Sequence, residues 1–247
     1  MRPDIVNLRQ FYSSRLGRKV KRRLRRLVRD YWASSDGLHM VGLGYATPFL
    51  PLPHANPSSR VIAVMPMVQG AMYWPIDSEN HSVLVDEMRP PFMPSSLHRV
   101  LMVHSFEHLA SADECLRIWW QLLVPGGRLM LMVPNRHGLW GRFGSTPFAS
   151  GTPHTLGSLR AMLNAANFTV RDARSALYAP PSEHPFWLRA FHALEWLGAL
   201  FGSRMGGILV VEAEKQIYAS VRESNVTVKS KANWQPSTIG TSPKEQQ

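Results

Sequence analysis

Five residues of the sequence have the types and spacing that suit ligand binding at the ends of buried strands. Gly42 and Gly44 form a G-x-G after an apolar run, where glycine lets the backbone turn tightly and approach a ligand closely. The acids Asp86 and Glu87 follow a second apolar run, and His104 ends a third. A carboxylate accepts hydrogen bonds from an amino group, and an imidazole can donate or accept a proton. These residues predict a small-molecule site.

The glycine pair is only part of a nucleotide-binding motif. A dinucleotide fingerprint requires G-x-G-x-x-G, and its third glycine is replaced by Thr47; a P-loop is also absent, which argues against an NTPase. Thr47 and Pro48 are typical of a helix cap followed by proline at the first helical position. We therefore expect a helix directly after the glycine loop, with a plain structural turn as the alternative for the glycines.

The segment 104–108 spells H-x-x-E-H, which is an inverted zinc-protease signature. That motif requires both histidines on one helical face, together with a third ligand. Here an apolar strand is predicted to run up to His104, so the two histidines would straddle a strand end. We expect no metal.

Short apolar runs alternate with helical patterns along most of the chain. Such alternation indicates an α/β fold with a parallel sheet that has helices on both faces, and the near-continuous apolar runs suit strands buried on both sides. The predicted strands are 40–43, 60–65, 82–85, 100–104, 128–133, 169–170 and 208–212, and the predicted helices are 112–123, 156–166 and 186–201.

Several motifs occur in an order that resembles class I S-adenosylmethionine-dependent methyltransferases, of the broad type 11 group. These are the G-x-G, "LVDEMRPPF", "HRVLMVHSFEHL" at 98–109, "LLVPGGRLMLMVPN" at 122–135 and "LRAMLNAANF" at 159–168. The resemblance covers about residues 36–220. It implies a Rossmann-like, mostly parallel seven-stranded sheet, S-adenosyl-L-methionine as cofactor, and methyl transfer to an acceptor that the sequence does not identify, a small molecule or a lipid.

The resemblance also implies roles for individual residues. Gly42 and Gly44 match the glycine loop along the methionine and ribose portions of the cofactor. Asp86 matches the acid after the third strand, and Glu87 lies beside it. In the family, the region of this acid binds the adenine amino group of the cofactor. His104 matches the residue near the methionyl end. No residue is obliged to be a catalytic base, although His104 or His108 could serve, so the catalytic residues stay unassigned.

One departure from the family concerns the second strand. The family usually places an acid there to hold the ribose hydroxyls, but no acid occurs between Tyr45 and Ile76. Met65 and Pro66 occupy the expected position, so we include Met65 among the cofactor-binding residues. Either backbone groups or Gln69 replace the acid, or cofactor affinity is reduced or lost.

Most of the net charge of +11 lies at the N-terminus. Residues 1–30 hold eleven Lys/Arg and two acids, whereas the other 217 residues are close to neutral. Nine of the fifteen residues from Arg15 to Arg29 are basic, and apolar residues from Leu16 to Tyr31 follow at helical spacing. One interpretation is a helix docked on the body with its cationic face in water. The other is a basic amphipathic helix that binds an anionic surface, either a membrane or nucleic acid, with lipid slightly favoured.

These patterns divide the chain into three parts. They are a basic helical arm (1–35), a methyltransferase-like domain (36–219), and a polar tail without periodicity (220–247) that we expect to be disordered. Within the domain, 136–153 is either a mobile lid or a plain loop, and 186–201 is a helix that is either buried or interfacial.

The sequence also carries information on where in the cell the protein is expected. One cysteine, Cys115, and the lack of a signal core or a long apolar span favour a cytoplasmic protein, either free or held at the inner face of a membrane. The alternative function is a degenerate, non-catalytic relative that binds an anionic surface or a partner protein through its basic arm.

Overall fold

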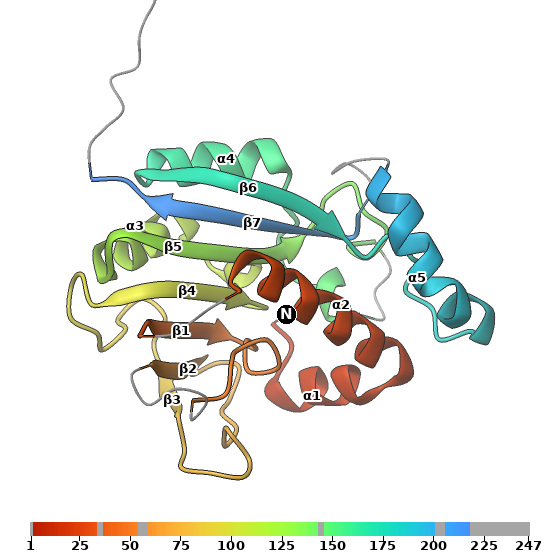
Figure 1. Ribbon diagram of the computed structural model, residues 1–247, viewed down its shortest axis with the longest axis horizontal. Helices are drawn as coiled ribbons and strands as arrows, with labels where there is room; N and C mark the ends of the chain where they lie inside the picture. Colours follow the sequence, from red (N-terminus) through yellow and green to blue (C-terminus); the bar gives the residue numbers. More distant parts are fainter. Residues whose placement is uncertain (1, 34–36, 54–58, 143–145, 201–205, 218–247) are drawn as a thin grey trace, which may run out of the picture.

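The computed structural model describes residues 2–33, 37–53, 59–142, 146–200 and 206–217. A seven-stranded sheet forms its centre, in the order β3-β2-β1-β4-β5-β7-β6 (Figure 1). The strands from β3 to β5 in this order are parallel, and β7 is antiparallel to its neighbours β5 and β6. This confirms the predicted mostly parallel α/β sheet. The strands are β1 (His39–Gly44), β2 (Arg60–Pro66), β3 (Ser82–Val85), β4 (Leu97–Val103), β5 (Leu123–Pro134), β6 (Phe168–Ala176) and β7 (Ile208–Lys215).

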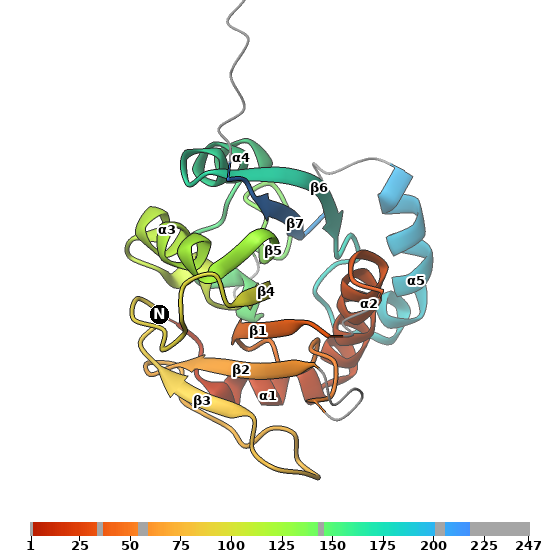
Figure 2. The same cartoon turned by 60° about the vertical axis from the view of Figure 1, so that its left-hand side comes forward.

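Helices cover both faces of the sheet, as predicted (Figure 2). Helices α3 (Ala112–Leu122) and α4 (Leu156–Ala165) pack on one face, and α1 (Ile5–Ser13), α2 (Arg15–Tyr31) and α5 (Pro185–Leu200) pack on the other. Two short 3₁₀ turns, η2 (Phe106–His108) and η3 (Pro147–Ala149), follow β4 and β5. The central strands β1, β4, β5 and β7 are buried on both sides because each face carries its own apolar cluster, whereas the edge strands β3 and β6 are partly exposed.

The basic arm is docked on the body of the protein. The apolar side chains of α2 are buried in the same core as those of β1 and the loop after it. At the end of the helix, the Nε1–H of Trp32 donates to Glu212 Oε1 of β7 at 2.7 Å. The segment from Leu8 to Trp32 therefore shares a core with the sheet. The division into 1–35 and 36–219 remains a proposal, and the predicted tail lies outside the described residues.

The helix expected after the glycine loop does not form. Residues 47–49 make a turn, and no α-helix follows in the described part of this loop, up to residue 53. Pro51 and Pro53 explain the difference, because each lacks the N–H that a helix would need at its position. The capping pattern at Thr47 and Pro48 was therefore misread.

Helix α1 lies within the predicted helical arm (1–35), but the sequence pattern did not separate it from α2. Its N-cap is Asp4, whose side chain accepts a hydrogen bond from the Asn7 N–H at 2.7 Å. Leu8 and Tyr12, four residues apart, are its buried residues, so the spacing of an amphipathic helix is present but short. None of the helices in the described ranges is long and apolar enough to cross a membrane.

Candidate cofactor site

A pocket of about 610 Å³ lies where β2, β3 and β4 end. Ligands in open α/β sheets bind at this carboxyl edge, and the volume lies in the usual range for small-molecule sites. The side chain of Asp86 is exposed at the pocket, and its Oδ1 accepts the Met88 N–H at 2.9 Å. The pocket therefore combines apolar walls with a carboxylate. Its walls include Met67, Val68, Val85, Met88 and Leu109, with Asp86 and Glu87 at the same edge.

Arg2, in the segment before α1, reaches across this edge. Its Nη1 contacts both carboxylate oxygens of Glu87, at 2.8 and 3.1 Å, and its Nη2 donates to the carbonyl oxygen of Ser105 at 3.2 Å. Both charged side chains are largely buried, which strengthens the pair relative to one in water. The predicted cofactor residue Glu87 is thus paired with the chain's own N-terminus.

A second buried network surrounds His104. Its backbone has φ +52°, which is uncommon for a residue other than glycine and marks local strain. Its Nε2 lies 2.8 Å from the hydroxyl of Tyr12, and that ring stacks on Tyr45 with centroids 5.3 Å apart. The ring of Phe148, from η3, packs against the imidazole at 4.6 Å. Tyr12 and Phe148 therefore enclose His104, and the predicted methionyl position is filled by protein.

Glu107 carries the charge of this network. It is buried, and its Oε1 lies 3.5 Å from His104 Nδ1. Burial raises the pKa of Glu107, but its interactions with His104 and His108 outweigh that effect and lower the pKa overall. Both of its carboxylate oxygens lack a hydrogen-bond partner within the described structure. A buried carboxylate without hydrogen bonds is costly even beside an imidazole, so the network suits a cationic group.

The two glycines serve the packing of the chain itself. Gly44 has φ +81°, and a Cβ there would collide with the carbonyl oxygen of Val103. A Cβ at Gly42 would lie 2.6 Å from Leu50 and 2.7 Å from Ala46. Glycine is thus required at both positions by neighbouring protein atoms, and a role toward a ligand stays a proposal.

Two of the residues considered at the second strand face the interior. Met65 is fully buried in the core, and its sulfur accepts the Met72 N–H at 3.1 Å. Its inclusion among the cofactor residues is corrected, because Met67 and Val68 line the pocket instead. Gln69 donates from Nε2 to the His104 carbonyl oxygen at 3.1 Å, so it links the loop after β2 to the loop after β4.

The sequence pattern identified the edge of the sheet but missed the residues that fill it. Asp86 and Glu87 line the pocket, whereas His104 is buried beside Tyr12 and Phe148, and a role of the three in binding the cofactor stays a proposal. Arg2 and Tyr12 were missed, because their contacts span 85 to 103 residues and no local pattern encodes them. In the described residues, no group of three His, Cys, Asp or Glu side chains is placed to hold a metal ion.

The sequence matches no family model and no curated protein, but solved structures share the fold. An S-adenosylmethionine-dependent methyltransferase of Thermotoga maritima, described as a possible histamine N-methyltransferase, has a TM-score of 0.58 and 15% identity, covering 86% of this chain and 96% of that one. One from Archaeoglobus fulgidus has a TM-score of 0.57 and 21% identity, covering 83% and 96%. Geranyl diphosphate C-methyltransferase from Streptomyces coelicolor A3(2), in complex with Mg²⁺, geranyl diphosphate and S-adenosyl-L-homocysteine, has a TM-score of 0.55 and 15% identity, covering 80% and 81%. The chain has the fold of class I methyltransferases.

Proposed function

We propose that this protein is an enzyme that binds S-adenosyl-L-methionine and transfers its methyl group to a small-molecule or lipid acceptor. The observation that carries the proposal is the pocket at the ends of β2, β3 and β4, which has apolar walls and the Asp86 carboxylate. The pocket occupies this position in a fold that solved methyltransferases share. Because one fold can host several activities, the proposal depends on the site as well as on the fold.

The pocket fits the nucleoside half of the cofactor. Val68, Val85 and Met88 offer apolar surface for the adenine ring. Asp86 retains an acceptor oxygen for an amino group, because only its Oδ1 is used by the backbone. The ribose hydroxyls have no acid after β2, so we expect weak binding, with a dissociation constant near or above the micromolar range, about −8 kcal/mol.

The methionyl half does not fit while the N-terminal segment holds its present position. Tyr12 fills the space over His104, and Arg2 crosses from Glu87 to Ser105. The buried carboxylate of Glu107 suits a cationic group, which the methionyl half carries. We infer that binding the whole cofactor displaces residues 2–12, so that the N-terminal segment competes with the cofactor.

Methyl transfer requires little of the protein beyond alignment of the acceptor with the methyl group. When bound, the cofactor supplies a methyl group on a sulfonium, and positioning of the acceptor can account for most of the catalysis. His108 is the available base, because burial lowers the pKa of its imidazole despite the opposing charge of Glu107, so it is neutral at pH 7 and can accept a proton. We place this activity in the cytoplasm.

A second pocket of about 580 Å³ suits the acceptor. It lies between α1 and the segment around η3, and its lining mixes the ring of Phe11 with polar groups such as Asn7 and Gln10. Phe148, in the same segment, packs on His104. The segment after β5 therefore lines the second pocket and also packs on the His104 network.

Calorimetry with S-adenosyl-L-methionine and S-adenosyl-L-homocysteine tests the proposal. We expect measurable binding of both by the wild-type protein, and about tenfold weaker binding by Asp86→Asn. Asp113→Asn, which removes an exposed carboxylate from the first turn of α3, is the matched control and should bind as the wild type does. Absence of binding by the wild type would instead support the non-catalytic relative.

A further inference from the structure

The outward face of α2 is a dense cationic surface. Arg15, Arg18, Arg22, Arg25 and Arg29 are exposed, and two shallow hollows of about 380 and 350 Å³ lie among the basic side chains of this helix. Within the described residues, Arg23 is the only basic side chain of α2 in an ion pair with a carboxylate. The remaining positive charges of the helix are therefore available to an anionic partner.

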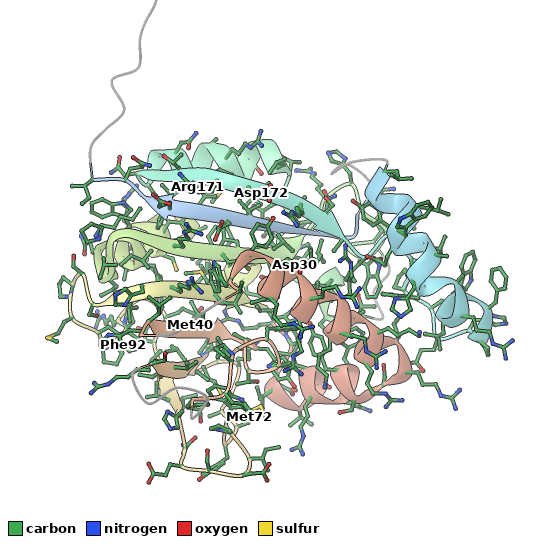
Figure 3. All side chains as sticks on the ribbon, viewed as in Figure 1. Asp30, Met40, Met72, Phe92, Arg171 and Asp172 are labelled. Carbon is green, nitrogen blue, oxygen red and sulfur yellow. The ribbon has the colours of Figure 1, made fainter. Side chains whose placement is uncertain are left out.

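The acid of α2 lies away from the centre of this surface. Asp30 is the only acidic residue of the helix and stands in its last turn, at the end farther from α5 (Figure 3). Nitrogen-tipped side chains gather along the rest of α2 in the same view. A partner that approaches the first four turns of the helix thus meets positive charge alone from this element.

The apolar stripe of α2 is not available to a partner. Leu16, Val20 and Leu24 are at most 4% exposed because they pack into the core of the body. The arm therefore cannot insert its own apolar face into a bilayer while the protein stays folded. Any apolar contribution to membrane binding has to come from another element.

Helix α5 supplies an exposed apolar face. Its buried side includes Leu188, Phe191 and Glu195. On the outward side, Phe186, Trp196 and Leu200 are 61%, 67% and 69% exposed, and Leu197 is partly exposed beside them. Exposed large apolar residues that share one helical face mark interaction sites, and Trp and Phe favour the interface of a bilayer.

The cationic and apolar faces adjoin one another. Arg23 Nε bonds Glu195 Oε2 at 3.1 Å, and Lys19 Nζ lies 6.0 Å from the centroid of Phe191. Leu188 of α5 lines a hollow together with arginines of α2. Both views of the ribbon show the two helices side by side (Figures 1 and 2). Their outer sides thus form neighbouring parts of one surface.

We propose that this α2–α5 surface binds the surface of an anionic phospholipid membrane. The basic side chains of α2 attract the headgroups, and Trp196, Leu197 and Leu200 enter the interfacial layer. Nucleic acid would also attract the arginines, and Trp196 can stack on a base, but Leu197 and Leu200 beside it have no such function and favour lipid. This inference is independent of the proposed methyl transfer.

Vesicle co-sedimentation of the full-length protein tests the inference. The probes are phosphatidylcholine vesicles with 30% phosphatidylserine, pure phosphatidylcholine vesicles, and a mixed-sequence DNA duplex. Three variants are compared with the wild type. They are Arg18→Gln/Arg22→Gln/Arg25→Gln on α2, Trp196→Ser/Leu200→Ser on α5, and the charge-matched control Arg60→Gln/Arg117→Gln/Arg160→Gln, whose residues are exposed on β2, α3 and α4. A thermal melt of each variant checks that the fold is retained.

We expect the wild type and the control to bind the anionic vesicles and not the neutral ones. At about 1 kcal/mol for each basic residue, the α2 variant should lose about 100-fold in partition coefficient. The α5 variant should lose at least tenfold, and raising the salt to 1 M should weaken binding of the wild type. Equal binding by the wild type and the α5 variant would overturn the proposal that α5 forms part of the membrane-binding α2–α5 surface. Binding to the duplex without binding to anionic vesicles would overturn the choice of lipid.

Discussion

Arg2 contacts Glu87 and Ser105 although 85 and 103 residues separate them in the chain. If this residue holds the N-terminal segment over the site, its removal should favour cofactor binding. We predict that Arg2→Met lowers the dissociation constant of S-adenosyl-L-homocysteine by about tenfold, measured by calorimetry. The reason is that displacing residues 2–12 from the site costs less free energy without the contacts of Arg2. Arg9→Met, on the exposed side of α1, is the control for the lost charge. Equal affinity in the wild type and both variants would show that Arg2 does not compete.

Cys115 gives a second test at the scale of one residue. Burial, together with the charge of Glu87, raises the pKa of the Cys115 thiol to about 12, and the side chain is fully buried. We predict that a disulfide reagent such as DTNB labels the native protein at pH 8 far more slowly than the urea-unfolded chain. Because the thiol has the lower pKa in the unfolded chain, it loses its proton there first as the pH rises. The free energy of unfolding should therefore decrease between about pH 9 and pH 12. Fast stoichiometric labelling of the native protein would contradict the packing of α3.

The residues of the site were predicted unevenly, for physical reasons. Asp86 and His104 could be placed because they directly follow apolar strands, and parallel strands end at the same edge. Met65 was misplaced because the strand pattern does not say which of its two faces meets the pocket. Tyr12 was missed because its partner His104 lies 92 residues away, so only the folded chain brings them together.

At the scale of elements, α2 was predicted by its helical spacing, but the spacing left open what its apolar face contacts. The structure shows that Leu24 is fully buried and that Arg22 is exposed. We predict that Leu24→Ala lowers the free energy of unfolding by about 2–5 kcal/mol, whereas Arg22→Ala changes it by less than about 0.5 kcal/mol, both measured by urea denaturation. A Leu24→Ala variant as stable as the wild type would mean that the arm is detached in solution.

The strands were the most predictable elements, because a strand buried on both faces requires a continuous apolar run. The runs before Gly44 and after Arg60 both satisfy this requirement. The loop between them was not predictable by capping signals alone, because Pro51 prevents the helix that Thr47 and Pro48 would begin. The local signals at Thr47 and Pro48 thus predicted a helix that does not form, because they take no account of a proline later in the segment.

At the scale of the whole molecule, the N-terminal segment joins the proposed cofactor site to α2. Helix α1 is attached to the loop after β2, where the Ile5 N–H donates to the Gln69 carbonyl oxygen at 2.9 Å, and it ends at Ser14, which caps α2. Helix α2 is held independently by the core and by the bond between Trp32 and Glu212. The competition we infer requires the segment before Ser14 to leave the core that it shares with α2, while α2 stays in place.

Hydrogen exchange in the presence of saturating S-adenosyl-L-homocysteine tests this separation. We predict faster exchange of the amides of α1, because the ligand displaces the segment from His104, and unchanged exchange of α2. The loop after β4 should exchange more slowly, because the ligand replaces the segment there. Arg2→Met should show part of the increase in α1 without ligand, and Arg9→Met should not. Slower exchange of α1 on ligand binding would mean that the cofactor enters beneath an unmoved segment, and the competition we infer between the N-terminus and the cofactor would be wrong.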